Sequence, residues 1–282
     1  MGECIHGFDD GLCAICFPPK APEPDPQPVV AARTRAARPA GESAARTAAR
    51  ATRTPAPSKG GRPLTEPPVD AAAMRVYHLT HLDNLARILG SGALLADAGS
   101  VPAAPVVDVA APAAREFRRR SELEGSGVPI AAYVPFFLST EAHLWTSIRD
   151  GEPDPRLVPE TEESPRSAAD FVLLVSSAGQ AAGARAAVDG HVAVSTADLA
   201  LPGAQAAVGW AEGERLLRRL SVAEDGLASG EFLVRDEVPL ERIQLIAVAN
   251  DRVRDRVRAA LTAVGVKTRV AVYPPWFLPT SA

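Results

Sequence analysis

The chain has 282 residues, 46% of them hydrophobic, and a formal net charge of −4, which is ample for a packed core in one large domain or two small ones. No apolar run approaches the ~20 residues that span a bilayer, and the N-terminus lacks the basic start and apolar stretch of a signal peptide. We therefore expect a cytoplasmic protein without a membrane partner.

All three cysteines lie in the first sixteen residues, so cysteine-dependent chemistry is excluded from the rest of the chain. Together with one histidine they form a C-x-H-x6-C-x2-C array, which offers the four ligands of a tetrahedral structural zinc. Four protein ligands leave no open position for catalysis. Residues 1–17 are thus predicted to be a Zn²⁺ knuckle that docks a partner, with the ligands Cys4, His6, Cys13 and Cys16.

Residues 18–71 are predicted to be a disordered linker. They are rich in Ala, Pro, Arg, Thr and Ser and contain almost no large apolar side chains that could offset the entropy of ordering. Residues 29–62 carry a local charge of +7, which leaves −11 for the remainder. A basic arm beside an acidic body is a common way to hold nucleic acid, although basic linkers also occur as simple spacers.

A folded domain is expected over residues 72–282. It opens with a short strand at 75–79, followed by a helix whose apolar residues recur at helical spacing and which ends at Gly90 and Gly92. The apolar positions of this helix are Leu82, Leu85, Ile88 and Leu89.

The second half of the domain adds further strands. They are predicted at 171–175, 231–234, 243–248 and 269–273. A helix between the last two begins at Asp251 and closes at Gly265, with one apolar face formed by Val253, Val257, Leu261 and Val264. Strands outnumber helices and do not alternate regularly with them, so the sequence predicts a mixed α+β fold without internal repeats.

Two segments combine apolar and polar features in a way that points to a site. In 133–139 the apolar run is interrupted by Pro135, which disfavours a central strand and indicates an edge strand or a pocket wall. Glu231 begins an apolar strand, where a carboxylate is costly unless it is paired or functional.

Four blocks in order resemble the DarT family of DNA ADP-ribosyltransferases, toxins of toxin–antitoxin pairs. The resemblance covers roughly residues 74–277. Its blocks are the His-Leu-Thr-His-x-Asp-Asn-Leu opening from His78, the Tyr-Val-Pro-Phe-Phe block from Tyr133, the Glu-Phe-Leu-Val strand from Glu231 and the ending at Trp276.

The resemblance implies an ADP-ribosyltransferase-like sheet core with flanking helices, NAD⁺ as donor and a base in single-stranded DNA as acceptor. Glu231 would stabilise the cationic ribose or position it against the nucleophile. His78 and Thr80 of the opening block would hold the ribose or nicotinamide of NAD⁺. Tyr133 and Phe137 of the second block are assigned to the same NAD⁺ site.

The family also uses an arginine between the first two blocks. Ungapped spacing favours Arg118 as the catalytic arginine, and Arg115 is a close rival that could instead bind NAD⁺. A solvated basic helix face would account for at least two of the four arginines in this region, namely Arg115, Arg118, Arg119 and Arg120.

The chain also departs from the family pattern. Phe137 stands where many relatives carry tyrosine, and Gly230 stands where many carry alanine. Alternatives that the residues leave open are an enzyme of this fold acting on RNA, a terminal phosphate or protein, and a non-catalytic nucleic-acid-binding module. A neighbouring antitoxin protein is a further expected partner.

Overall fold

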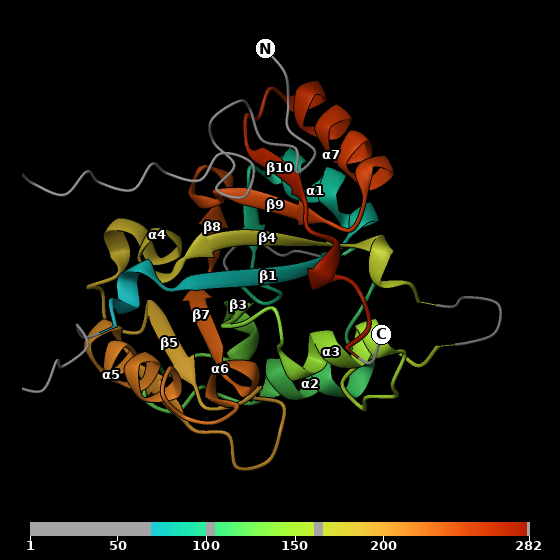
Figure 1. The fold of residues 1–282 in the computed structure, drawn as a ribbon. Coiled ribbons are helices and arrows are strands. Elements are labelled where there is room, and N and C mark those ends of the chain that lie inside the picture. The colour runs from blue at the N-terminus through green and yellow to red at the C-terminus, as the bar shows by residue number, and fades with distance from the viewer. Residues whose placement is uncertain (1–68, 100–104, 161–165, 281–282) are drawn as a thin grey trace, which may run out of the picture. The chain divides into compact units, whose positions relative to one another are not determined.

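An eight-stranded mixed sheet organises the described part of the chain (Figure 1). The computed structural model describes residues 69–99, 105–160 and 166–280. β9 and β10 run parallel, and all other neighbouring strands pair antiparallel. From edge to edge the order is β10 (Arg269–Val272), β9 (Leu245–Val248), β4 (Phe171–Ser177), β1 (Arg75–His81), β3 (Tyr133–Phe137), β7 (Glu231–Arg235), β5 (Val192–Ser195) and β6 (Ala206–Val208).

Helices and a small ribbon surround this sheet. The ribbon pairs β2 (Ala93–Leu95) with β8 (Glu237–Pro239). The α-helices of the described ranges are α1 (Leu85–Ser91), α2 (Pro112–Arg120), α3 (His143–Asp150), α4 (Ala178–Ala182), α5 (Trp210–Leu220), α6 (Gly226–Ser229) and α7 (Asp251–Val264). Short 3₁₀ helices lie at Ala71–Ala73, Leu82–Asn84, Ile130–Ala132, Ala168–Asp170, Gly183–Arg185, Leu240–Arg242 and Pro274–Trp276. The predicted mixed α+β class is confirmed.

The sheet consists of two halves that meet at a single point. β1 pairs with β4 along its whole length and β3 pairs with β7 along its whole length. Between β1 and β3, however, the only register pair is Tyr77 with Phe137. In Figure 1 the strands β4 and β1 accordingly run in a different direction from β7 and β5. The separation of β1 from β3 leaves room for a cleft inside the sheet.

The position of Pro135 corrects one prediction and supports another. β3 is an interior strand, so the expected edge position is wrong. The backbone edge of Pro135 faces β1, because its carbonyl accepts a hydrogen bond from His78. At Pro135, β1 and β3 are no longer paired, so the N–H that proline lacks has no partner strand to bond to, and no hydrogen bond of the sheet is lost. Pro135 does line cavities, as a pocket wall should.

Both faces of the sheet are buried. Alternate residues of a strand point to opposite faces, and in β4 Val172 and Leu174 join a cluster with apolar residues of α1 and α7. Leu173 and Val175 join a second cluster with Trp145 of α3. This two-sided burial explains why β4 is a continuous apolar run.

The helix ends refine the sequence predictions. Gly92, with φ +73°, caps α1, whereas Gly90 lies within that helix, so Gly92 alone ends it. α7 starts and ends as predicted, with Gly265 as its left-handed C-cap. Val253, Val257 and Leu261 are buried on its inner face, but Val264 is exposed, contrary to expectation. The four later strands lie where predicted, within two residues at each end.

The N-terminal predictions fall outside the described residues. These are the zinc knuckle at 1–17 and nearly all of the linker at 18–71. The first described element is the 3₁₀ helix Ala71–Ala73, whose N-terminal amides are capped by the carboxylate of Asp70. Among the helices of the described residues, none has the length and apolarity needed to cross a membrane.

Candidate active site

A cavity of about 880 Å³ opens between β1 and β3. His78 and Thr80 line it from β1, and Tyr133 and Pro135 line it from β3. α2 contributes two arginines to its wall. The volume lies within the range of ~300–1,000 Å³ that is typical of sites for small molecules and cofactors.

His78 is held as a neutral imidazole with a fixed tautomer. Its Nδ1 donates to the carbonyl of Pro135 at 2.9 Å, so Nε2 is the unprotonated nitrogen of the neutral ring. Burial lowers the pKa of His78, and the Pro135 carbonyl only partly offsets this. The ring packs edge-on against Phe136 at 5.6 Å. His78 can therefore accept a hydrogen bond from a ligand in the cleft.

Asn84 fastens a loop to the wall of the cleft. Its Oδ1 accepts from the amides of Val106 and Val107 at 2.7 and 2.8 Å. Its Nδ2 donates to the carbonyl of Val107 and to the hydroxyl of Thr80. Asn84 is buried, and the loop that it holds brings Asp108 into the lining of the cleft. The side chain thus ties a predicted binding residue, Thr80, to the loop opposite.

All four arginines of α2 have acidic partners, and for three of them the partner lies outside the helix. Arg115 forms ion pairs with both Asp97 and Asp108, and Arg119 donates to the same Asp97. Arg115 therefore lies in the wall of the large cleft with its charge already balanced. Arg118, one helical turn further on, leaves this group and turns toward Glu231.

Glu231 lies at the start of β7, opposite Phe137 of β3 and Ser195 of β5. It is only 3% exposed. Arg118 Nη2 donates to both of its oxygens, at 2.8 and 2.9 Å, and the amide of Leu199 donates to Oε2 at 3.2 Å. The carboxylate is thus the buried, paired group that the sequence predicted.

The surroundings push the pKa of Glu231 upward. It is raised to about 7, because burial and, to a smaller extent, the negative charge of Asp198 outweigh the opposing effect of Arg118. For Arg118, burial lowers the pKa, but Glu231 and Asp198 together raise it above its ordinary value, so it stays charged. A carboxyl group that exchanges its proton near neutrality beside a permanent cation is suited to proton transfer.

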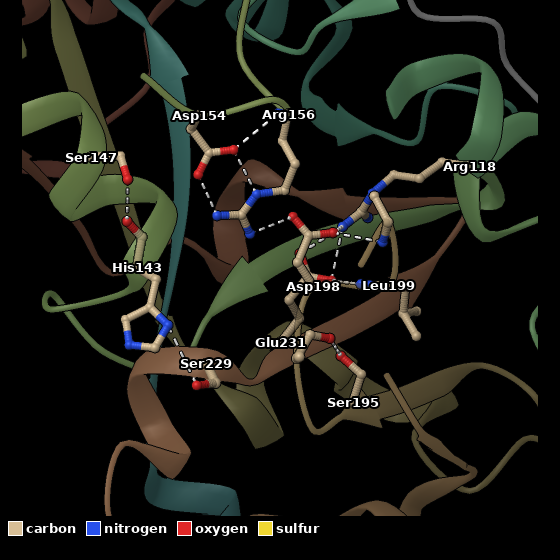
Figure 2. Close-up of polar contacts among 12 residues, drawn as sticks. Arg118, His143, Ser147, Asp154, Arg156, Ser195, Asp198, Leu199, Ser229 and Glu231 are labelled. Atoms are coloured by element: carbon tan, nitrogen blue, oxygen red, sulfur yellow. Dashed lines mark hydrogen bonds and ion pairs between the residues drawn. The ribbon is translucent and has the colours of Figure 1, made fainter. Parts of the chain in front are cut away.

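An alternating row of charges continues beyond Glu231 (Figure 2). Asp198 pairs with Arg118 through Oδ1 and with Arg156 through Oδ2. Arg156 is held by Asp154, with Nε and Nη2 at 2.9 and 2.6 Å from its two oxygens. The order is Asp154, Arg156, Asp198, Arg118, Glu231, and in Figure 2 Asp198 stands between the two guanidinium groups.

A smaller cavity of about 200 Å³ joins the cleft to this row. It is lined by Glu231 and Phe137, and it shares His78, Arg118 and Pro135 with the larger cavity. The neutral histidine of β1 and the carboxylate of β7 therefore face one continuous region.

The structure distributes the residues predicted for the NAD⁺ site between these cavities. His78, Thr80, Arg115 and Tyr133 line the large one, and Phe137 lines the small one. The hydroxyl of Tyr133 donates to the carbonyl of Gly190 at 2.7 Å, so only the body of its ring can face a ligand.

Several site residues were missed by the sequence analysis. Asn84 lies within the opening block, and its position just after a histidine-threonine strand was a usable signal. Asp198, Arg156 and Asp154 lie in loops without periodicity, where nothing local marks them. Within the described residues no group of three or more His, Cys, Asp or Glu side chains is placed to bind a metal ion. The predicted zinc ligands lie outside those residues.

This geometry is compatible with ADP-ribosyl transfer. Breaking the bond between a ribose and nicotinamide leaves positive charge on the sugar, which a fixed buried carboxylate can stabilise. A family model described as "ssDNA thymidine ADP-ribosyltransferase, DarT" matches residues 77–197 and 224–278, more than half of the chain. The chain belongs to the DarT family. It is an ADP-ribosyltransferase of single-stranded DNA.

Solved structures agree with this fold. Thermus sp. 2.9 DarT in complex with ADP-ribosylated ssDNA is 24% identical, with a TM-score of 0.59 over 73% of this chain and 96% of that one. The same protein in complex with NAD⁺ is 23% identical, with a TM-score of 0.55 over 73% of this chain and 98% of that one. A search of curated proteins gives no match.

Proposed function

We propose that the chain transfers ADP-ribose from NAD⁺ to a thymine base in single-stranded DNA, with Glu231 and Arg118 as the catalytic residues. The observation that carries this proposal is the buried Glu231–Arg118 pair at the end of the cleft. The family description supplies the acceptor, thymidine. The complexes of Thermus DarT with NAD⁺ and with ADP-ribosylated ssDNA support the donor and the product.

The cleft between β1 and β3 has the properties of an NAD⁺ site. Nε2 of His78 would accept a hydrogen bond from a ribose hydroxyl or the nicotinamide amide, and Thr80 would add its hydroxyl. Arg115 would bind the pyrophosphate once the half-exposed carboxylate of Asp108 gives way to it. Tyr133 and Phe137 would supply ring surfaces.

Bound NAD⁺ supplies the glycosidic bond that breaks, with nicotinamide as the neutral leaving group. Glu231 would stabilise the positive charge that develops on the ribose carbon. Thymine in DNA has one ring N–H, because its other ring nitrogen carries the deoxyribose, and this proton would pass to Glu231 as the new carbon–nitrogen bond forms. Arg118 would hold Glu231 in place during the transfer. The balance is NAD⁺ plus DNA giving ADP-ribosyl-DNA, nicotinamide and a proton.

The test is intact-mass spectrometry of oligonucleotides incubated with the full chain and NAD⁺. Single-stranded DNA with thymine should gain one ADP-ribose, whereas DNA without thymine should not. Glu231→Gln should abolish the product, and Glu237→Gln, which changes an exposed glutamate of β8, should not. Modification of RNA or protein alone would keep the enzyme class and reject the acceptor. NAD⁺ left intact with every acceptor would favour a binding module.

The N-terminal residues are proposed to assist this reaction. Residues 1–17 would hold Zn²⁺ through Cys4, His6, Cys13 and Cys16, and the basic linker at 18–71 would concentrate nucleic acid near a catalytic domain at 72–282. Native mass spectrometry of the full chain should show one zinc per molecule, and Cys13→Ser should remove it. A zinc-free wild-type protein purified without chelator would reject the knuckle.

The biological role proposed is that of a toxin paired with an antitoxin, acting in the cytoplasm. The ring N–H of thymine lies on the base-pairing edge, so ADP-ribose attached there would stop the strand from serving as a template. An antitoxin would have to block the enzyme or remove the mark. Induction of the wild-type chain should arrest growth in a bacterial host, and induction of Glu231→Gln should not.

A further inference from the structure

Asp198 lies close to Glu231 and links three segments, namely its own loop, α2 and the loop after α3. It lies in the loop after β5 and is 8% exposed. Its Oδ1 accepts from the amide of Ala200 at 2.9 Å, which fixes the turn. The amide of Leu199, between these two residues, donates to Glu231. The same carboxylate meets Arg118 from α2 and Arg156 from the loop after α3. The family match leaves out residues 198–223, so it assigns Asp198 no role.

Asp198 and Glu231 compete for one nitrogen. Nη2 of Arg118 donates to both oxygens of Glu231 and also to Oδ1 of Asp198. A guanidinium bound by Glu231 alone would hold that carboxylate ionised and inert as a base. A second carboxylate on the same nitrogen weakens this hold while it keeps Arg118 in place.

The charges of the row do not cancel when all groups are ionised. Asp154, Asp198 and Glu231 carry three negative charges, and Arg118 and Arg156 carry two positive ones. The unbalanced charge favours one bound proton, which goes to the carboxylate with the least compensation and the deepest burial. Asp154 and Glu231 each bond to only one of the two arginines, and Glu231 is the more deeply buried, with its side chain 4% exposed against 9% for Asp154, so Glu231 is that group.

We propose that Asp198 is a positioning residue of the transfer reaction, which holds Arg118 beside Glu231 and keeps Glu231 a working base, and that Arg156 controls how strongly it does so. The inference rests on the proposed role of Glu231. The direction of the pKa shifts agrees with it, since Asp198 raises the pKa of Glu231 and Arg118 lowers it. Asp198 itself has a lowered pKa, because its two arginines outweigh its burial.

Two substitutions should move the titration of Glu231 in opposite directions. Asp198→Asn keeps the shape and the hydrogen-bond acceptor but removes the competing charge, so the pKa of Glu231 should fall. Arg156→Gln removes a cation and leaves Asp198 to compete harder for Arg118, so the pKa of Glu231 should rise. Nearby charges shift pKa values by about one unit or more at such distances.

The measurement is the single-turnover rate on single-stranded DNA between pH 5.5 and 9. The wild-type rate should rise with a midpoint near the Glu231 pKa of about 7. The midpoint should fall by about one pH unit in Asp198→Asn and rise by about one in Arg156→Gln. The KM for NAD⁺ should change less than the rate. Asp198→Glu and Arg156→Lys, which keep the charges, should stay near the wild-type midpoint.

Other groups that face Glu231 must be separated from it. His78 of β1 and His143 of α3 line cavities together with Glu231. His143→Gln should leave the midpoint unchanged. Glu116→Gln and Arg120→Gln each remove one charge of an exposed ion pair on α2, a negative and a positive one, as Asp198→Asn and Arg156→Gln do in the row. Both should leave the midpoint unchanged. Melting temperatures identify variants that fail to fold, and Asp198→Ser replaces Asp198→Asn in that case.

Carboxyl ¹³C NMR of glutamate-labelled protein reads the same titration without turnover. The Glu231 signal is the one that Glu231→Gln removes. The pH at the midpoint of its titration should fall in Asp198→Asn and rise in Arg156→Gln. The proposal would be overturned if both variants shifted the Glu231 midpoint in the same direction. It would also be overturned if they lost activity while the Glu231 titration stayed unchanged. A wild-type enzyme that modifies no DNA would reject the proposed function, and the NMR titration would still decide this inference.

Discussion

The two ends of the cleft are built in different ways. The end at β1 depends on neutral hydrogen bonds, in which His78 bonds to a carbonyl and Asn84 bonds to Thr80 and to the loop at 106–107. The end at β7 depends on charges, with Glu231 and Asp198 sharing Arg118. Neutral contacts fix the shape of a site, whereas a shared charge also fixes where a proton resides.

This contrast suggests a division of labour. Substitutions at the neutral end should weaken donor binding and raise KM, because they disturb the walls of the cavity. Substitutions at the charged end should reduce the rate of the chemical step, because they disturb the group that handles charge and the proton.

The largest effect is expected for Glu231→Gln. Glutamine keeps the size of the side chain but can neither take a proton nor balance positive charge, so the transfer rate should fall by about 10³-fold or more. The KM for NAD⁺ should change little. Single-turnover kinetics with excess NAD⁺ measure this. A loss below tenfold would place the reacting base elsewhere.

A comparison of Arg118→Lys with Arg115→Lys tests which arginine serves which end. The lysine side chain is one bond shorter, so its ammonium cannot reach the position of Nη2 between Glu231 and Asp198, and the rate should fall by about 10²-fold. Arg115→Lys should instead raise the KM for NAD⁺ by about tenfold, because the fork that would bind the pyrophosphate is lost. If the two variants exchanged these effects, Arg115 would be the catalytic arginine.

The same contrast explains what sequence could and could not predict. The strand bearing His78, the helix over 251–264 and the buried Glu231 follow from local apolar periodicity, although the strand was predicted to end at 79 and runs to His81. The row from Asp154 to Glu231 could not be predicted, because ion pairs between loops far apart in sequence leave no periodic trace. Arg118 could be chosen over its neighbours only through the family spacing, since helix periodicity does not tell which acid an arginine meets.

Asn84→Ala tests whether the hydrogen bonds at the neutral end serve NAD⁺ binding. Removal of the amide unties the loop at 106–107 from Thr80, so the KM for NAD⁺ should rise by about tenfold while the saturated rate changes about twofold or less. Hydrogen exchange at Val106 and Val107 should accelerate. The matched control is Asn250→Ala, which removes the N-cap of α7 and should cost about 1 kcal/mol of stability with KM unchanged.

The last prediction concerns stability as a function of pH and not the rate or the KM. Because burial raises the pKa of Glu231 in the folded chain to about 7 from 4.5, the folded state holds a proton that the unfolded state has lost between these values. The contribution of Glu231 to stability is therefore full below about pH 4.5 and is lost as pH rises through about 7.

Asp198, whose pKa is lowered, contributes with the opposite sign, but only as the pH falls toward and below its ordinary value of 3.8. In the window from pH 5 to 7.5, His78 and His191, whose pKa values are lowered, also change stability with pH. The difference between Glu231→Gln and the wild type isolates Glu231, because both chains carry these histidines. Across this window, the wild type should lose about 3 kcal/mol that Glu231→Gln does not, so the variant should gain by about 5–10 °C in Tm, and the gap should stay constant above pH 8. A gap that does not change with pH would mean that Glu231 is already ionised at pH 5, held so by Arg118 without effective competition from Asp198.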